Sequence, residues 1–161
     1  MSNGSRKKTI GRKRVSKRTP PPDGVRSGLR EPVAPEDVSL REGKGSPNRG
    51  AGPGGEYWHV QVSGRRVGYV YVNVIDEPPI GQHASLQIQI AKAWQGRGVG
   101  RVAYALAVKA SHHFIIYLHM RRSNVASARA AECAGFREYV DPEIRQHVMI
   151  STKKAPGPAG G

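Results

Sequence analysis

The sequence predicts a small α/β domain built on one mixed sheet, with its elements in the order ββ-β-α-β-α-ββ. Three observations predict it. Runs rich in aromatic and β-branched residues alternate with turn signals between residues 57 and 90, which is typical of strands. Two later segments carry the residue patterns of helices. A short apolar run, residues 114–118, separates these helices, and a strand that follows a helical crossover pairs in parallel.

Both ends of the chain have a composition that predicts disorder. The first 55 residues carry 13 Lys or Arg against five Asp or Glu, and all ten aromatic residues come after them. Such a segment buries too little apolar surface to offset its chain entropy. Residues 153–161 are rich in Pro and Gly. We therefore expect a disordered basic tail (1–55), a folded domain (56–152) and a disordered C-terminal tail (153–161).

The strands of the first half follow from residue alternation. Residues 57–62 and 67–74 flank the turn signal Ser63-Gly64-Arg65-Arg66, which predicts a β-hairpin. Residues 78–81 break the pattern, and residues 84–90 then alternate apolar and polar side chains. This alternation predicts a third strand.

The second half begins with a helix. From residue 98 to about residue 112, apolar residues recur at helical spacing, which predicts an amphipathic helix. Residues 114–118 are continuously apolar and predict a strand that is buried on both faces.

A second helix and a pair of strands complete the domain. Asn124 is a good N-cap, and Gly135 stands where a helix commonly ends in the left-handed conformation. These signals predict a helix over residues 125–134. Residues 136–140 and 144–151 then predict a closing strand pair.

The stretch Gln95-Gly96-Arg97-Gly98-Val99-Gly100 joins a predicted strand to a predicted helix. The first amides of a helix have no intrahelical partner, and the helix dipole adds positive potential there, so such a turn binds phosphate. Its glycines let an anion approach the backbone, and Arg97 and Arg101 add positive charge. Its spacing excludes the G-x-G-x-x-G dinucleotide fingerprint and the G-x-x-x-x-G-K-S/T phosphate loop.

This stretch fits the Q/R-x-x-G-x-G/A pattern of the GNAT acyl-CoA acyltransferases. Asn124, which begins a helix ending at Gly135-Phe136, resembles the second half of the same family. The resemblance covers residues 56–152. It implies the GNAT fold, a mostly antiparallel mixed sheet with one splayed parallel strand pair, and N-terminal elements that are reduced or missing here. In that region only residues 33–43 offer structure, as one short helix over residues 35–41.

The resemblance also implies acetyl-CoA as co-substrate and no metal. In the family, the pantetheine arm pairs with a strand backbone, the pyrophosphate meets the glycine-rich turn, and an Asn at the next helix contacts the cofactor. The corresponding residues are Ile88, Gln89, Ile90, Gln95, Gly96, Arg97, Gly98, Val99, Gly100, Arg101 and Asn124.

The resemblance implies a general base for the incoming ammonium, and His119 is our candidate. It stands five residues before Asn124, where some family members carry a glutamate base. An imidazole with a pKa of about 6.5 suits this role. The alternative is that His119 only packs at a strand end. His83, His59 and Glu132 are reserve candidates, each expected at the surface.

The sequence departs from the family at the general acid. Many relatives carry a tyrosine seven residues after the Asn, where this chain has Ala131. Ser127, one turn earlier on the same helix face, or a bound water could replace it. Because a thiol has a pKa of about 8.5, its thiolate can leave without a strong acid. We expect Cys133 to be a core residue and not a nucleophile.

The expected function is N-acetyl transfer from acetyl-CoA to a primary amine on a protein or an aminoacyl-RNA. A different class remains open, a protein that binds nucleic acid or another partner through a weak or inactive GNAT domain. A small-amine acceptor is disfavoured because the acceptor-side elements are missing. Cationic residues near the N-terminus suit nucleic-acid contact through counterion release. They are Arg6, Lys7, Lys8, Arg12, Lys13, Arg14, Lys17 and Arg18.

Other compositional features bear on cell location. A single cysteine excludes an intramolecular disulfide, and no apolar run suits a signal peptide or a membrane span. We therefore expect a cytoplasmic protein without membrane contact. The family resemblance also allows a homodimer.

Overall fold

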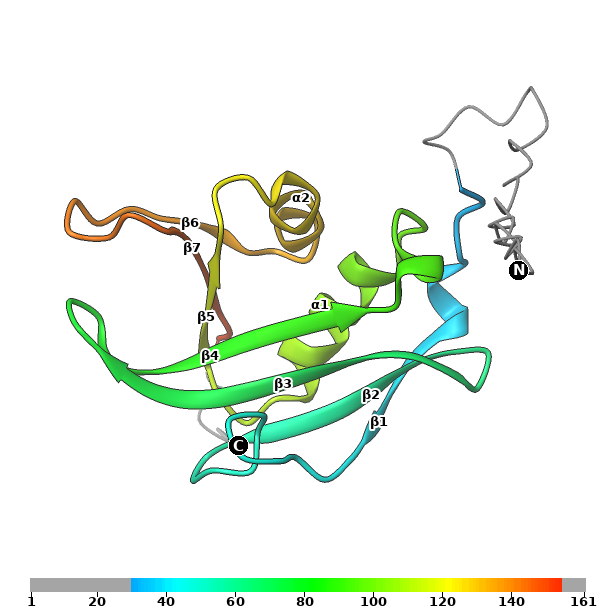
Figure 1. Cartoon of the computed structure of the whole chain (residues 1–161), viewed down its shortest axis with the longest axis horizontal. Coiled ribbons are helices and arrows are strands. Elements are labelled where there is room, and N and C mark those ends of the chain that lie inside the picture. Colours follow the sequence, from blue (N-terminus) through cyan, green and yellow to red (C-terminus); the bar gives the residue numbers. More distant parts are fainter. Residues whose placement is uncertain (1–29, 155–161) are drawn as a thin grey trace, which may run out of the picture.

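The computed structural model describes residues 30–154, which form one mixed sheet with two α-helices (Figure 1). The sheet has seven strands in the order β1-β2-β3-β4-β5-β7-β6. Its strands are β1 (Val38–Glu42), β2 (Glu56–Val62), β3 (Arg65–Glu77), β4 (Gly81–Ile90), β5 (Ile115–Met120), β6 (Arg137–Tyr139) and β7 (His147–Thr152). The α-helices are α1 (Val99–Ala110) and α2 (Val125–Cys133), and two 3₁₀ turns are η1 (Pro35–Asp37) and η2 (Lys92–Trp94). The predicted α/β class is confirmed.

Strands β1 to β4 form an antiparallel meander whose central turn has the predicted chemistry. Ser63 and Gly64 connect β2 to β3, with φ angles of 49° and 80°. Two successive positive φ angles give a two-residue turn whose twist matches that of the strands it joins. The hairpin predicted over residues 57–74 is therefore confirmed, although β3 extends further than its apolar run, to Glu77.

Strands β4 and β5 are the splayed parallel pair. Only Ala84 with Ile116 and Ser85 with Tyr117 are in register, yet β4 runs on to Ile90 and β5 to Met120. Beyond the paired positions the two strands separate, which leaves the end of β4 without a neighbour on that side. The parallel crossover expected from the strand, helix, strand order is confirmed.

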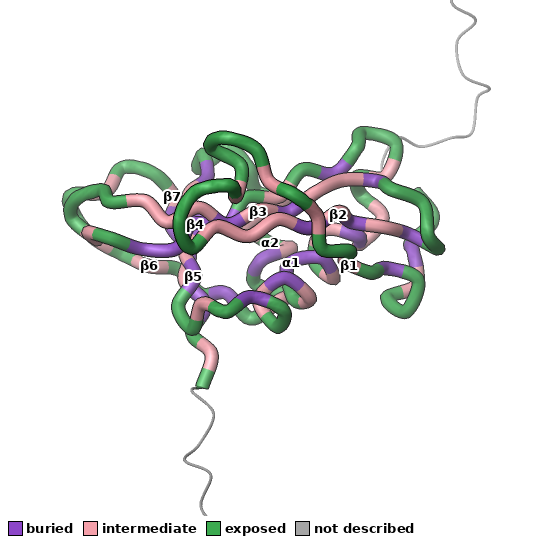
Figure 2. Tube along the Cα trace, turned by 90° about the horizontal axis from the view of Figure 1, so that it is seen from below, coloured by how far each residue is buried: buried purple, intermediate pink, exposed green. Residues whose placement is uncertain are grey.

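Both α-helices cover the same face of the sheet (Figure 2). Alternate residues of β2, β3 and β4 form the core on this face, where Val60, Val70, Val72 and Leu86 are fully or almost fully buried beside Ala103 and Ala107 of α1. Helix α2 contributes the fully buried Ala131. In Figure 1, α1 lies behind β3 and β4, so the viewer faces the side of β1–β4 that neither helix covers.

The predicted boundary of the fold at residue 55 is wrong. β1 pairs with β2 over five positions, and Val33 and Val38 belong to the core. The helix expected over residues 35–41 is instead one 3₁₀ turn followed by this strand. Sequence reasoning missed β1 because its apolar positions are few and lie among charged residues, while its pairing partner comes much later in the chain. The disorder expected for residues 1–29 and 155–161 lies outside the described residues.

The expectation that the strand over residues 114–118 is buried on both faces is also wrong. Phe114 is 49% exposed and Ile115 is 50% exposed, whereas Ile116, Leu118 and Met120 are buried. The strand alternates because the helices pack against only one face of the sheet. Within residues 30–154, no helix is both long and apolar enough to cross a membrane.

Candidate active site

A cleft of about 580 Å³ lies where the end of β4, the start of α1 and the helix α2 meet. Its floor is the free end of β4, and its far wall is one side of α2. It is lined by Ile88, Gln89, Ile90, Trp94, Gln95, Gly96, Gly98, Gly100, Arg101, Tyr104, Asn124, Ala126, Ser127, Arg129, Ala130 and Cys133. The cleft therefore combines an unpaired strand end with a helix start, and two arginines are the charged residues of its lining.

The turn between β4 and α1 owes its shape to its glycines and one glutamine. Gly96 and Gly98 have φ angles of 71° and 83°, which other residues adopt at a cost. The side chain of Gln95 donates a hydrogen bond of 2.8 Å to the carbonyl oxygen of Ile90, which folds the turn back onto the strand. No side chain caps α1 at Gly98, so its first amides can bind an anion.

Nine of the eleven residues predicted to bind the cofactor line this cleft. They are Ile88, Gln89, Ile90, Gln95, Gly96, Gly98, Gly100, Arg101 and Asn124. The other two side chains do not line it. Val99 is buried in the core, and Arg97 stacks over Trp94 at 4.5 Å and donates a hydrogen bond to the carbonyl of Glu31.

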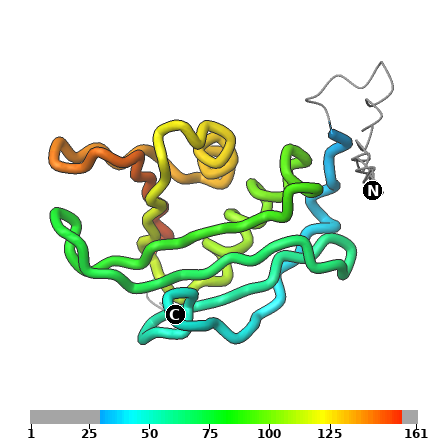
Figure 3. Tube along the Cα trace, viewed as in Figure 1, coloured from blue at the N-terminus to red at the C-terminus, as the bar shows by residue number. Residues whose placement is uncertain are grey.

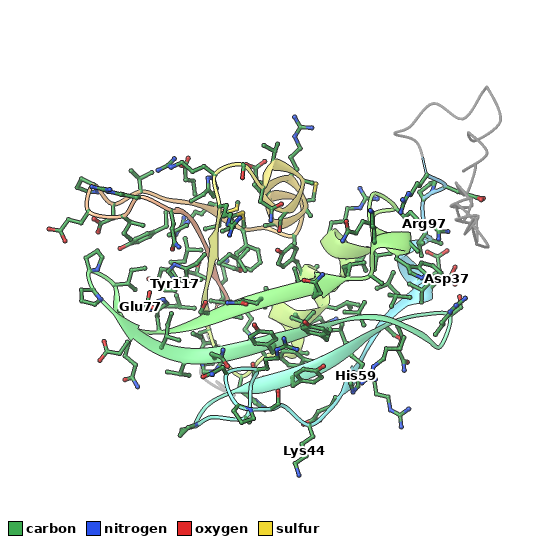
Figure 4. The ribbon with its side chains drawn as sticks, in the orientation of Figure 1. Asp37, Lys44, His59, Glu77, Arg97 and Tyr117 are labelled. Carbon is green, nitrogen blue, oxygen red and sulfur yellow. The ribbon has the colours of Figure 1, made fainter. Side chains whose placement is uncertain are left out.

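Arg97 thus holds the segment that precedes β1 in place. Its own carbonyl accepts a 2.8 Å hydrogen bond from the amide of Val33, and Figure 3 shows this segment running beside the glycine-rich turn. In Figure 4, Arg97 lies at this segment near Asp37. The sequence could not reveal this role, because the partner residues lie within the segment expected to be disordered.

Comparison with known protein families identifies the family of this chain. The model of the acetyltransferase (GNAT) family matches residues 28–136, which is more than half of the chain. The chain belongs to the GNAT family. No curated protein sequence matches it significantly.

Several solved GNAT structures are similar to this chain. A putative GnaT-family acetyltransferase from Bordetella pertussis is 24% identical, with a TM-score of 0.50 over 61% of this chain and 65% of that one. RimJ from Mycobacterium smegmatis, in complex with CoA-disulfide, is 21% identical, with a TM-score of 0.49 over 61% and 53%. AAC(6')-Ib in complex with ribostamycin and coenzyme A is 19% identical, with a TM-score of 0.49 over 62% and 64%. This GNAT chain spans less than two thirds of each.

Helices α1 and α2 each contribute one hydroxyl to the lining of the cleft of this GNAT protein. Ser127 Oγ and Tyr104 Oη lie 2.7 Å apart and join α2 to α1. Tyr104 is only 3% exposed, and burial raises the pKa of its hydroxyl, an effect that the hydrogen bond with Ser127 partly offsets. Sequence reasoning singled out Ser127 but missed Tyr104, because their contact depends on how the two helices pack.

Other residues of α2 have the following places. Asn124 is the predicted N-cap, and its Oδ1 accepts a 3.3 Å hydrogen bond from the amide of Ser127. Ala131 is fully buried in the core. Cys133, which we expected in the core, is instead exposed and lines the cleft. It is exposed because it lies on the side of α2 that lines the open cleft.

His119 does not line the cleft. It lines a second pocket of about 210 Å³, between the turn that joins β3 to β4 and the connection from β6 to β7. Figure 4 shows this end of the molecule, where the labelled Glu77 and Tyr117 lie. The structure therefore places the two predicted catalytic residues, Ser127 and His119, in separate hollows.

His119 is paired with His83, whose hydrogen bonds define the arrangement of protons. His83 Nδ1 lies 2.7 Å from the carbonyl oxygen of Gly81, which can only accept, so this nitrogen carries a proton. In neutral His83, Nε2 is then an acceptor, and His119 Nε2 lies 2.8 Å from it and donates. This leaves the lone pair of His119 on Nδ1.

Burial lowers the pKa of His119, and the neighbouring His83 lowers it further. Glu77 and a hydrogen bond with Gln146 oppose this effect. His119 therefore stays neutral, and able to accept a proton, down to a lower pH than an ordinary histidine. Of the reserve candidates, His83 is buried beside it, which contradicts the expectation of a surface position, while Glu132 is exposed and His59 lies elsewhere on the sheet.

Proposed function

We propose that this GNAT protein is an N-acetyltransferase that moves an acetyl group from acetyl-CoA to a primary amine on a macromolecule. The observation that carries the proposal is the cleft in which the unpaired end of β4 meets the uncapped, glycine-rich start of α1. A strand edge and a helix start offer two kinds of backbone donor in one hollow, which suits a ligand with an amide-bearing arm and a phosphate group.

Acetyl-CoA would occupy the cleft in an orientation that these donors define. Its pantetheine arm would pair with the backbone at Ile88–Ile90, where β5 has separated from β4 and makes no hydrogen bonds with it. Its pyrophosphate would bind the first amides of α1, with Arg101 as counter-charge. The thioester would then point along β4 toward the paired part of β4 and β5.

His119 is the proposed general base. The acceptor amine would enter through the smaller pocket, where Nδ1 of His119 takes the proton of its ammonium form. The amine nitrogen then attacks the thioester carbonyl, the carbon–sulfur bond breaks, and coenzyme A leaves as a thiolate. His83 keeps its hydrogen bond with Nε2 of His119 and so holds the resulting imidazolium ring in place.

Ser127 is the proposed route by which the thiolate regains a proton. Its hydroxyl lines the cleft and is hydrogen-bonded to Tyr104, whose raised pKa keeps it protonated near neutral pH. The pair can pass a proton from Tyr104 through Ser127 to sulfur and recover it from solvent. It would supply from two helices the acid that position 131, an alanine here, lacks.

A protein or an aminoacyl-RNA is the proposed acceptor class. The pocket at His119 is small. A small pocket suits the end of a side chain, or an aminoacyl group on a larger molecule, better than it suits an entire free amine that carries several charges. The alternative is a binding protein with a weak or inactive GNAT domain. It is favoured by one specific observation, the alanine at position 131.

The test is release of thiol from acetyl-CoA in the presence of three acceptors, a lysine-containing peptide, an aminoacylated RNA and a small diamine. We expect acetylation of at least one macromolecular acceptor, confirmed by mass spectrometry, and loss of turnover in His119→Gln. If acetyl-CoA binds but none of the acceptors is acetylated, the alternative is preferred. Turnover of the diamine alone would contradict the proposed acceptor class.

A further inference from the structure

The face of β1–β4 that neither helix covers carries a ladder of three tyrosines, Tyr57, Tyr69 and Tyr71. The rings of Tyr57 and Tyr69 are stacked at 5.9 Å between centroids, and those of Tyr69 and Tyr71 at 6.1 Å. All three side chains are half-buried, so part of each ring is accessible. His59, which is labelled in Figure 4, lies beside the ladder, with its ring 5.2 Å from that of Tyr57 between centroids.

Arginines surround the tyrosine ladder. The guanidinium of Arg49 lies over the ring of Tyr69 at 5.4 Å from its centroid. Arg66 donates a 2.8 Å hydrogen bond to Nδ1 of His59, and Arg41 is in register with His59 on the neighbouring strand. Burial and these two arginines lower the pKa of His59, so it is neutral near pH 7 and the arginines supply the charge.

The positions that share this face near the ladder include no Asp or Glu. Along the described strands they are Ser39, Arg41, Tyr57, His59, Gln61, Arg66, Tyr69, Tyr71, Gln87 and Gln89. Gln87 and Gln89 are exposed, and Tyr71 donates a 2.5 Å hydrogen bond to Gln87. The surface therefore combines aromatic rings, positive charge and amide groups without any carboxylate of its own at these positions.

The connection from β1 to β2 holds Arg49 in this position. The amide of Gly50 donates a 2.8 Å hydrogen bond to Oδ1 of Asn73, and Nδ2 of Asn73 donates a 2.7 Å bond to the carbonyl of Asn48. Gly50 has a φ of 83°, and a Cβ there would lie 2.3 Å from the carbonyl oxygen of Glu56. Asn73 thus clamps the residues on both sides of Arg49 to β3.

We propose that this face, which we call the tyrosine face, binds single-stranded nucleic acid. Bases stack on aromatic rings and on arginine planes, and arginines neutralise phosphates, so the ladder and its three arginines match both parts of such a ligand. The exposed amide of Gln87 can reach a base edge. A duplex hides its bases from a sheet surface, which makes a single strand the ligand of choice.

The inference is independent of acetyl transfer. It concerns a surface on the opposite side of the sheet from α1 and α2, which form the walls of the cleft (Figure 2). The protein could bind a strand here whether or not it acetylates anything. A chain with a formal net charge of +14 attracts every polyanion, so a useful test must separate stacking from charge.

The test is fluorescence anisotropy of the full chain with a labelled single-stranded RNA and with an abasic strand of the same length and charge. We expect the RNA to bind at least about tenfold more tightly, because its bases stack on the tyrosine rings and the abasic strand has none. Tyr69→Leu should remove this preference and leave the affinity for the abasic strand unchanged. Tyr69→Phe should keep it, since a phenyl ring still stacks.

Two further variants guard against effects of folding. Arg49→Gln changes an exposed side chain in the connection from β1 to β2 and should weaken RNA binding several-fold, while Tyr139→Leu, on β6 away from the face, should not. Equal binding of RNA and abasic strand, or an unchanged preference in Tyr69→Leu, would overturn the proposal. A duplex that binds as tightly as the single strand would also overturn it. The same holds if Tyr69→Leu weakens the binding of an acidic peptide but not that of RNA.

Discussion

The hydroxyls of Tyr104 and Ser127 lie 2.7 Å apart and connect the second turn of α1 to the first turn of α2 beside the cleft. Neither position is the one at which the family's general acid is expected, yet the pair presents a protonated group to the cleft. Substitution of either hydroxyl therefore tests whether this pair protonates the leaving thiolate.

Tyr104→Phe should lower kcat and leave the binding of acetyl-CoA unchanged. General acid catalysis contributes about 10²-fold or more where the leaving group needs a proton, and a thiolate needs it less, so we expect roughly tenfold. Ser127→Ala should have a similar effect, and the double variant should lose no more than either single one. Steady-state thiol release measures all three. An unchanged kcat in both single variants would exclude this proton route.

The rate should depend on pH through His119. Burial and His83 lower the pKa of His119 below the ordinary value of about 6.5. The imidazole is protonated, and inactive as a base, only when the pH falls below this lowered pKa. We therefore expect kcat/KM to rise with pH through a midpoint below 6.5 and then to level off.

Glu77→Gln is the matched variant for this prediction. Glu77 raises the pKa of His119, so its neutralisation should move the midpoint to still lower pH without removing the base. His119→Gln should abolish the acidic limb together with most of the activity. A midpoint above 6.5, or an acidic limb that survives in His119→Gln, would show that another group is the base.

The strand β1 should be essential for stability. Val38 is 6% exposed and packs in the core, so Val38→Ala should lower the free energy of unfolding by roughly 1–3 kcal/mol. The neighbouring Ser39 is exposed, and Ser39→Ala should change it by less than about 0.5 kcal/mol. Urea denaturation followed by circular dichroism measures both.

Truncation tests the same strand. Removal of residues 1–55 deletes β1 and leaves the edge of β2 unpaired, so we expect aggregation or loss of cooperative unfolding. Removal of residues 1–29 is the control and should leave the unfolding transition unchanged. A chain of residues 56–161 that unfolds cooperatively with native stability would contradict the importance of β1.

Much of the fold was predictable because its signals are local. The Ser63-Gly64 turn, the alternation in β4 and the Asn124 cap each lie within a few residues of the element they define. β1 was not predictable in this way, since its pairing with β2 forms across a glycine-rich connection of the kind that composition marks as disordered.

The candidate site shows the same division. The glycine-rich turn lines the cleft because a strand, a turn and a helix start are contiguous in sequence, and Asn124 lines it as the family resemblance implies. The place of His119 depends on where the connection from β6 to β7 folds, and the contact of Tyr104 with Ser127 depends on helix packing. The side chain of Arg97 lies outside the predicted anion site because it stacks on Trp94 and donates a hydrogen bond to the segment before β1.

The central claim is that the cleft at the start of α1 binds acetyl-CoA, and calorimetric titration of acetyl-CoA into the full chain tests it directly. Gly100→Val is the informative variant, because a Cβ at Gly100 meets only Ala130 at 4.0 Å, so the fold accepts it while the side chain enters the cleft. Lys109→Ala, in the last turn of the same helix, is the control. The account predicts binding to the native chain and to Lys109→Ala, and binding at least about tenfold weaker to Gly100→Val, or a loss of about 1.4 kcal/mol. A folded native chain that does not bind acetyl-CoA, or a folded Gly100→Val chain that binds it equally well, would contradict the account.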